Sequence, residues 1–474
     1  MKNLLGALLL TLALSQSAPV ATAAASDRAS PARGELIEAL APGGDESESY
    51  AIYLPTGYQP ERTWPVVIVM DPRGRATTAG AIFVPAAERF GYVVLSSAST
   101  RSDLAPGSPD PNEPALRALL DVAVSEYAGN PARIYLAGFS GTSRFAWMAG
   151  KAFPDRIAGV IGVGGGLPGP WRDWNQVSFS YFGAAGKHDF NHREMRELDE
   201  LLDGSLAHRF HYFSGGHQWP DEEDAELALG WMELQAMRRG LAEPRTDLIA
   251  SLFEERMRAA EEAERRGDAF GAFEALLAIT EDFEALSADD ALDPIRARLA
   301  ALASSDRVKH ENSVIAEAIE SEREYREKLG AIVRRIAYEP APPDSSNLSR
   351  ELEVLDLQSQ ARGESRAADS ARRRLELAFV HMAFYTPSGL MAKNAPRRAA
   401  LSLEIATAIF PDRVFPWLRL AEARASAGQK KAAILAVAEA VNLGFSDADY
   451  LRSHDGLKPL DDEPTFEKLI RQLE

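Results

Sequence analysis

The chain has 474 residues, of which 70 are acidic and 52 basic, so its formal net charge is -18 at pH 7. A surface of this charge repels a phosphate backbone, which argues against nucleic-acid binding. The sequence contains no cysteine, which excludes disulfides, thiolate metal sites and a cysteine nucleophile. A single hydrophobic core rarely grows beyond about 250–300 residues, so the length predicts more than one structural unit.

Residues 1–25 have the pattern of a secretory signal peptide. Lys2 supplies the positive charge and Leu4–Leu14 the apolar segment. Ala21–Ala23 and Ala23–Ala25 both place small residues at the spacing of a cleavage site. The alternative is a membrane anchor, but the apolar run is short for the ~30 Å of a bilayer core. We therefore expect cleavage, a periplasmic or secreted bacterial protein, and no membrane span.

Residues 26–240 alternate between strand-like and helix-like segments. The expected strands are Ser49–Leu54, Trp64–Met70, Gly91–Ser97, Arg133–Phe139, Ile157–Val163, Val177–Gly183 and His208–Phe213. The expected helices are Ala76–Phe90, Glu113–Tyr127, Thr142–Phe153, Asn191–Leu206 and Asp221–Arg238. Near-continuous apolar strands are typical of a sheet covered by helices on both faces. The pattern predicts an α/β domain with a doubly wound, mostly parallel sheet.

Helical periodicity replaces this alternation after residue 240, where Glu, Arg, Ala and Leu predominate. Pro294 predicts a turn between two helices, and the Pro- and Ser-rich segment Glu339–Asn347 predicts a linker. These breaks separate a helical region with its linker, residues 241–346, from a second all-α part, residues 347–474.

Small and apolar residues recur in the last part of the chain. Their spacing is that of a helix–turn–helix unit of about 34 residues. The positions are Trp417, Ala421, Gly428, Ala433 and Ala440 in one unit, and Ala383, Ala399, Leu403, Ala406 and Pro411 in the unit before it. The pattern resembles a tetratricopeptide array, in which each helix pair buries its apolar face on the next. The alternative is an ordinary helical bundle. We expect a tetratricopeptide-like repeat domain over residues 347–474.

The segment Arg133–Thr142 carries the strongest signal for chemistry. An expected strand leads into Gly138-Phe139-Ser140-Gly141, and a helix follows. A serine at such a sharp strand-to-helix turn exposes its hydroxyl, and small neighbours avoid clashes with the flanking strand and helix. Thr142 replaces the second flanking glycine, so the motif is G-x-S-x-T. The alternative is that Ser140 is an ordinary helix N-cap.

On this motif, on the acid and histidine segments below and on the strand order, residues 36–240 resemble the α/β-hydrolase superfamily. They are most similar to its esterase branch, which includes polyhydroxybutyrate depolymerase-like and feruloyl-esterase-like secreted enzymes. The resemblance covers less than half of the chain. It implies an α/β-hydrolase domain over residues 26–240 and catalytic groups in the order serine, acid, histidine.

Two later strand ends supply the acid and the histidine. Asp189 follows the strand that runs to Gly186, and His217 follows the strand His208–Phe213 and two glycines. Because the carboxyl ends of parallel strands share one sheet edge, we expect Ser140, Asp189 and His217 to meet there. His217 would take the proton of Ser140, and Asp189 would orient the imidazole. The alternatives are a helix cap at Asp189 and an ordinary loop histidine at position 217.

Acyl transfer also needs hydrogen-bond donors for a developing oxyanion. The resemblance implies the N–H of Gly141 as one donor and the loop Met70–Arg75 as the source of the second. Pro72 has no N–H, so we expect Arg73, although the loop also fits a simple Asp-Pro-x-Gly turn.

Two tryptophans and a group of histidines invite further interpretation. Trp171 and Trp174 follow another strand end, where they either line a substrate pocket or pack their own loop. Five of the eight histidines lie between His188 and His217. They lack the third ligand and the glutamate of a zinc-protease helix, so we expect no metal and no cofactor.

The sequence therefore predicts a secreted serine hydrolase that cleaves carboxylic esters of small molecules or polymers. The helical repeats would bind a protein partner. A peptidase of the same fold is one alternative. A non-catalytic scaffold that acts through its helical repeats is another, and the departure at Thr142 keeps it open.

Overall fold

The computed structural model describes residues 31–40, 49–102, 104, 108–169, 177–286 and 289–474. The expected signal peptide and the two candidate wall residues Trp171 and Trp174 lie outside these ranges. Within them, no helix combines the length and apolar character needed to cross a membrane.

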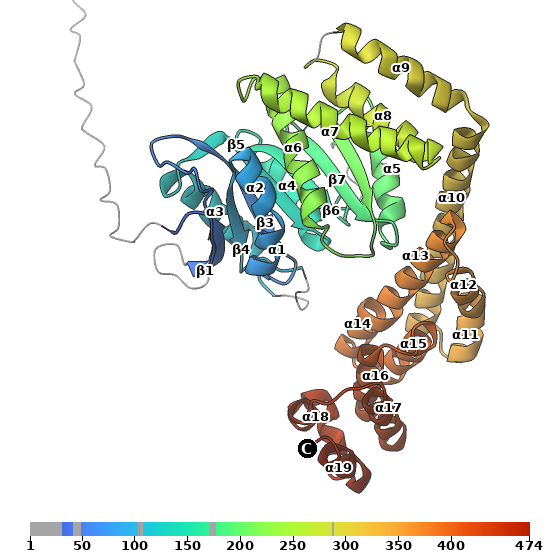
Figure 1. Cartoon of the computed structure of the whole chain (residues 1–474). Helices are drawn as coiled ribbons and strands as arrows, with labels where there is room; N and C mark the ends of the chain where they lie inside the picture. The colour runs from blue at the N-terminus through green and yellow to red at the C-terminus, as the bar shows by residue number, and fades with distance from the viewer. Residues whose placement is uncertain (1–30, 41–48, 103, 105–107, 170–176, 287–288) are drawn as a thin grey trace, which may run out of the picture.

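Eight strands form one mixed sheet (Figure 1). They are β1 (Leu36–Leu40), β2 (Tyr50–Tyr53), β3 (Trp64–Met70), β4 (Val93–Ser97), β5 (Gly129–Phe139), β6 (Ile157–Val163), β7 (Ser180–Gly186) and β8 (His208–Phe213). The strand order is β1-β2-β4-β3-β5-β6-β7-β8. Strand β2 alone runs opposite to the others, because it pairs antiparallel with both β1 and β4, and β3 to β8 are all parallel. Their carboxyl ends therefore share one edge of the sheet.

Helices cover both faces of the sheet, because each parallel strand is apolar on both sides. In β3, Val67 and Val69 belong to one hydrophobic core, and Val66 and Ile68 belong to another. The first core is covered by α1 (Ala76–Ile82), α2 (Val84–Phe90) and α6 (Glu222–Arg238). The second is covered by α3 (Asn112–Ser125), α4 (Gly141–Ala152) and α5 (His192–Leu202). The predicted doubly wound α/β sheet is thus observed.

Three further helices extend the first of these cores. They are α7 (Thr246–Arg265), α8 (Ala269–Phe283) and α9 (Asp289–Ser304). Pro294 lies inside α9, so the turn predicted at this proline is wrong. The break comes earlier, between Phe283 and Asp289. The helix continues through Pro294 because the flanking side chains Leu292 and Ile295 are buried in the core.

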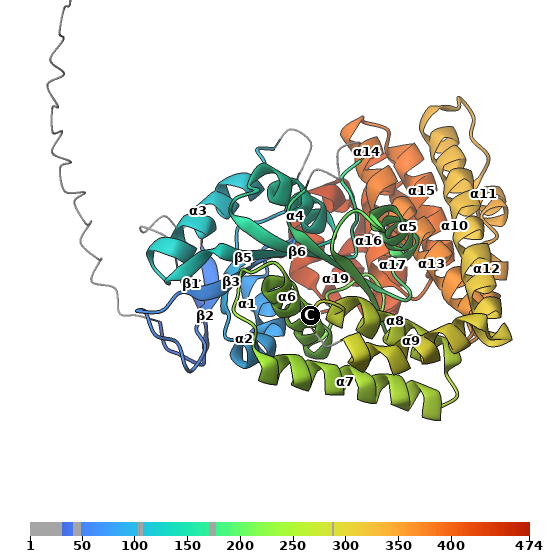
Figure 2. The same ribbon diagram turned by 90° about the horizontal axis from the view of Figure 1, so that it is seen from above.

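The rest of the chain is helical and has its own core, which runs from Tyr325 to Ile470. The long helix α10 (Asp306–Tyr338) leads away from α9, and a series of shorter helical elements follows it along the chain (Figures 1 and 2). They are α11 (Ser345–Glu351), α12 (Val354–Gln360), α13 (Arg366–Val380), the π-helical turn η4 (His381–Tyr385), α14 (Thr386–Ala392), α15 (Pro396–Ile409), α16 (Val414–Ser426), α17 (Lys430–Asn442), α18 (Ala448–Ser453), the 3₁₀ turn η5 (Asp455–Leu460) and α19 (Pro464–Arg471).

Helices α16 and α17 pack against each other, with Gly428 at a positive φ of 76° in the turn between them. Ala421 and Ala433 are buried in the helical core, as expected of small residues where two helices approach closely. In the unit before, Ala383 lies within the π-helical turn η4. The repeat architecture and the predicted domain boundaries stay predictions. Hydrophobic contacts cross residue 240 in one core and residue 346 in the other.

Candidate active site

Ser140 lies in the sharp turn between β5 and α4. Its backbone has φ 56° and ψ -118°, a conformation that costs a non-glycine residue about 1–3 kcal/mol. Gly138 allows the turn to close, because a Cβ at this position would lie 2.4 Å from the carbonyl oxygen of Thr142. The strain and the close approach are those expected of a turn that presents a serine hydroxyl at a sheet edge.

Thr142, which departs from the usual glycine, is fully buried and ties this turn together. Its hydroxyl oxygen accepts from the N–H of Phe139 at 3.1 Å. Its hydrogen points toward two carbonyl oxygens, those of Met70 at 2.5 Å and Phe139 at 2.8 Å. The threonine thus links the end of β3 to the turn at the end of β5.

The side chains of Ser140, His217 and Asp189 form a continuous chain of hydrogen bonds. The Oγ of Ser140 is 2.9 Å from Nε2 of His217. Nδ1 of His217 is 2.9 Å and 3.0 Å from the two carboxylate oxygens of Asp189. Because a carboxylate only accepts, Nδ1 carries a hydrogen, which leaves Nε2 to accept the serine hydrogen. This geometry allows a proton to pass from Ser140 to His217.

The surroundings of Asp189 and His217 fix both side chains. Asp189 is fully buried, and its Oδ1 accepts from the N–H of Asn191 at 2.7 Å. The His217 ring lies between Phe139 and Phe190, with ring centroids 4.6 Å and 4.3 Å away. The two aromatic rings flank the imidazole and limit its rotation, which favours the alignment of its two nitrogens with the carboxylate and the hydroxyl.

The loop after β3 does not leave the N–H of Arg73 free for the oxyanion role that the sequence predicted. The N–H of Arg73 donates to Oδ1 of Asp71 at 2.8 Å, and Gly74 N–H donates to the Asp71 carbonyl at 3.0 Å. The loop is thus a closed turn, and the hydrogen expected to face an oxyanion is already engaged, which counts against this role.

Asp71 instead connects this turn to the histidine loop. Burial alone would raise the pKa of Asp71, but hydrogen bonds from Arg75, Trp219 and the Arg73 N–H together hold that pKa below its ordinary value. The carboxylate accepts from the Trp219 indole at 2.9 Å, two residues after His217. Asp71 therefore positions the loop that carries the imidazole.

Ser102 lies beside the N-terminus of α4 and was not predicted as a site residue. A Cβ added to Gly141 would lie 2.3 Å from the Cβ of Ser102. The N–H of Ser102 donates to the Pro72 carbonyl at 2.9 Å, which holds the residue against the loop after β3. Ser102 lines the same cavity as Ser140 and Gly141, the first residue of α4.

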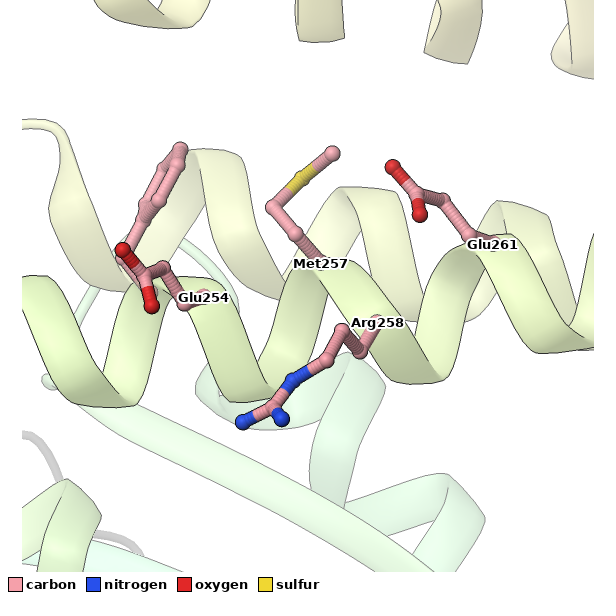
Figure 3. Close-up of a pocket in the computed structure, with 5 residues that line it drawn as sticks. Glu254, Met257, Arg258 and Glu261 are labelled. Atoms are coloured by element: carbon pink, nitrogen blue, oxygen red, sulfur yellow. The ribbon is translucent and has the colours of Figure 1, made fainter.

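This cavity, of about 210 Å³, lies over Ser140 and has walls from both halves of the chain. Its lining residues are Ser102, Ser140, Gly141, Arg144, Phe190, Asn191 and Glu194 from the sheet domain, and Arg326, Leu377, His381 and Tyr385 from α10, α13 and η4. A second hollow, of about 290 Å³, lies along α7 beside Met257 and Arg258 (Figure 3). It has no serine, threonine or histidine in its lining, so the cavity over Ser140 is the candidate site.

The helical part of the chain also holds the loop that carries Asp189. Nη1 of Arg373 on α13 donates to the carbonyl of Lys187 at 2.7 Å. Nε2 of His188 is 2.9 Å from Oδ1 of Asp369, also on α13. Phe190 packs against the core of the helical part. Two contacts before Asp189 thus come from α13, and one contact after it comes from the core of the helical part.

The other clustered histidines each have a separate partner. His208 is bonded to Asp199 at 3.1 Å and His211 to Asp224 at 2.6 Å. His192 is buried against the Tyr212 ring, and burial followed by nearby positive charges places its pKa well below the ordinary value. Among the described residues, no three metal-ligating side chains come together.

No protein-family model matches the sequence, and no curated protein matches it. Among solved structures, the chain is similar to the serine hydrolase FphF of Staphylococcus aureus, with 12% identity and a TM-score of 0.33 over 39% of this chain and 91% of the other. The S-formylglutathione hydrolase FrmB of the same species has 11% identity and a TM-score of 0.33, over 43% and 98%. An esterase of Thermogutta terrifontis has 15% identity and a TM-score of 0.32, over 42% and 90%.

Proposed function

We propose that this protein is a serine hydrolase that cleaves carboxylic esters of small substrates through an acyl-enzyme. The observation that carries the proposal is the hydrogen-bonded series from Ser140 through His217 to the buried Asp189. A serine hydroxyl is a weak nucleophile until a base accepts its proton, and a carboxylate behind the imidazole fixes the tautomer that can accept it.

In the proposed reaction, the Ser140 oxygen attacks the ester carbonyl carbon while His217 accepts the hydroxyl proton. The tetrahedral intermediate collapses, the C–O bond to the alcohol breaks, and His217 returns the proton to the departing oxygen. Water then attacks the acyl-enzyme with His217 again as base, and the acid is released. Asp189 keeps its negative charge throughout and stabilises the imidazolium.

The oxyanion of this intermediate needs donors at the N-terminal end of α4. We assign the N–H of Gly141 and the hydroxyl of Ser102, which lines the cavity beside it. We expect Ser102→Ala to lower kcat by about 10²-fold with little change in KM, since one such donor typically contributes about 10²–10³-fold. Ser108→Ala, in the same loop, is the matched control. An unchanged kcat for Ser102→Ala would remove the residue from the oxyanion site.

A fluorophosphonate probe tests the proposal directly. Full-length protein should be labelled at Ser140, located by peptide mass spectrometry, and Ser140→Ala should stay unlabelled. Turnover of a 4-nitrophenyl ester without turnover of a peptide anilide would support an esterase, and the opposite preference would support the peptidase alternative. Absence of labelling in the wild type would contradict the proposal and favour the scaffold alternative.

The remaining roles stay predictions. Export rests on residues 1–25, outside the described ranges. Binding of a protein partner by the helices rests on the tetratricopeptide-like spacing. The cavity supports an additional role for α10, α13 and η4, because these elements supply one wall of the proposed substrate site.

A further inference from the structure

The charges that line the cavity over Ser140 do not balance. Three charged side chains contribute to the lining: Arg144, Glu194 and Arg326. Both carboxylate oxygens of Glu194 already accept hydrogen bonds from Arg144, and one also accepts from the N–H of Gly166 at 2.9 Å. The pair formed by Arg144 and Glu194 is neutral as a unit, which leaves the guanidinium of Arg326 as an excess positive charge.

Arg326 lacks the partners that a partly buried guanidinium ordinarily has. Its Nε is buried and has no hydrogen-bond partner among the described residues, and no described carboxylate forms an ion pair with it. The neighbouring Arg193 is by contrast paired with Glu197. Burial, followed by the charge of Arg193, lowers the pKa of Arg326, and the opposing effects of Glu194 and Glu197, which are themselves paired with Arg144 and Arg193, do not offset this lowering. A partly buried cation that has no ion pair of its own is costly unless a ligand supplies one.

The other groups around Arg326 leave it available to a ligand. Burial, followed by the charge of Arg326, lowers the pKa of His381, so this imidazole is neutral at pH 7 and adds no charge. Tyr385 stacks edge-on to His381 at 5.5 Å and is 61% exposed, which places its ring at the mouth of the cavity. Leu377 and Phe190 supply apolar lining. The site thus combines apolar contact with one unmatched guanidinium.

We propose that this cavity takes esters that carry a carboxylate, and that Arg326 holds this carboxylate while Ser140 attacks the ester. The inference rests on the proposed hydrolase function and specifies its substrate class. A guanidinium matches a carboxylate with two parallel hydrogen bonds, which gives both orientation and affinity. With a net charge of -18, the protein as a whole repels anions, so such selectivity has to come from this local charge.

A matched ester pair tests the assignment. Monomethyl glutarate is an anion at pH 7.5 and dimethyl glutarate is neutral, and hydrolysis of both is followed by pH-stat with full-length protein. We expect wild type to prefer the monoester. Arg326→Met should lower kcat/KM for the monoester by about 10- to 100-fold, the range for a charge-assisted hydrogen bond, and change diester hydrolysis by less than about 3-fold. Arg326→Lys should recover part of the loss.

Arg334→Met is the control, because Arg334 is an exposed arginine of the same helix and does not line the cavity. Fluorophosphonate labelling of every variant reports whether Ser140 still reacts. Free glutarate should slow labelling of wild type and have no effect on Arg326→Met, a readout that needs no ester turnover.

The outcomes separate the two proposals. Three results would overturn the carboxylate site. They are an equal loss of kcat/KM for both esters in Arg326→Met, a wild-type preference for the diester, and fluorophosphonate labelling of wild type without turnover of either ester. If the fluorophosphonate probe does not label wild type, or if Ser140→Ala retains ester turnover, the hydrolase function on which the carboxylate site rests would be overturned instead.

Discussion

Ser140→Ala and His217→Ala are each expected to lower kcat for a 4-nitrophenyl ester by about 10⁶-fold, and Asp189→Asn by about 10⁴-fold. Serine and histidine act as one unit, so removing either removes the whole nucleophilic step. The asparagine keeps the geometry of Asp189 but favours the wrong imidazole tautomer, so some activity survives. The measurement is steady-state turnover at pH 7.5, with freshly purified variants free of wild type.

The double variant Ser140→Ala/His217→Ala sharpens this test. Because the two side chains act together, it should be no slower than either single variant. His208→Ala serves as the histidine control, since His208 bonds to Asp199 and does not line the cavity. Near-normal turnover in His217→Ala would exclude this residue as the base.

Arg373→Met is expected to destabilise the protein by about 3–5 kcal/mol, because it leaves the carboxylate of Glu322 buried without its partner. Nε and Nη2 of Arg373 bond to the same Glu322 oxygen at 2.9 Å and 2.6 Å, and both side chains are buried. Urea unfolding followed by circular dichroism would measure the loss. A midpoint equal to that of wild type would show that the pair contributes nothing.

Arg373→Met/Glu322→Met separates stability from positioning. Replacing both charges by apolar side chains should restore most of the stability. The double variant still lacks the hydrogen bond from Arg373 to the Lys187 carbonyl, two residues before Asp189. We therefore expect kcat to stay lowered by about 10-fold, since small displacements of a catalytic group are costly. Full recovery of kcat would limit Arg373 to a structural role.

The sequence was sufficient to predict seven of the eight strands, though not β1 (Leu36–Leu40), and the three residues that meet at the sheet edge. Apolar runs such as Trp64–Met70 identify buried strands, and the carboxyl ends of parallel strands necessarily share one edge. The strand ends near Ser140, Asp189 and His217 could therefore be related before any coordinates. The helix expected over Ala76–Phe90 is divided into α1 and α2, because Pro85 cannot continue the helix that precedes it.

The rest of the site could not be predicted, because its residues have no local signal. Ser102 lies in a loop without a motif, and its role depends on contact with Gly141. Arg326 is one of many arginines on a charged helix, and only its place in the cavity distinguishes it. The turn formed by Asp71 and Gly74 was one of two readings of its loop. The choice between them depended on the contact with Trp219, which comes from a distant strand end.

The order of the site residues along the chain determines when, during synthesis, the proposed preference for carboxylate-bearing substrates can arise. A chain synthesised only as far as the loop after β8 already contains Ser140, Asp189 and His217, but α10, α13 and η4 do not yet exist. Its nucleophile would face open water, with nothing to discriminate between charged and neutral molecules. Selectivity would be acquired only when synthesis reaches Tyr385.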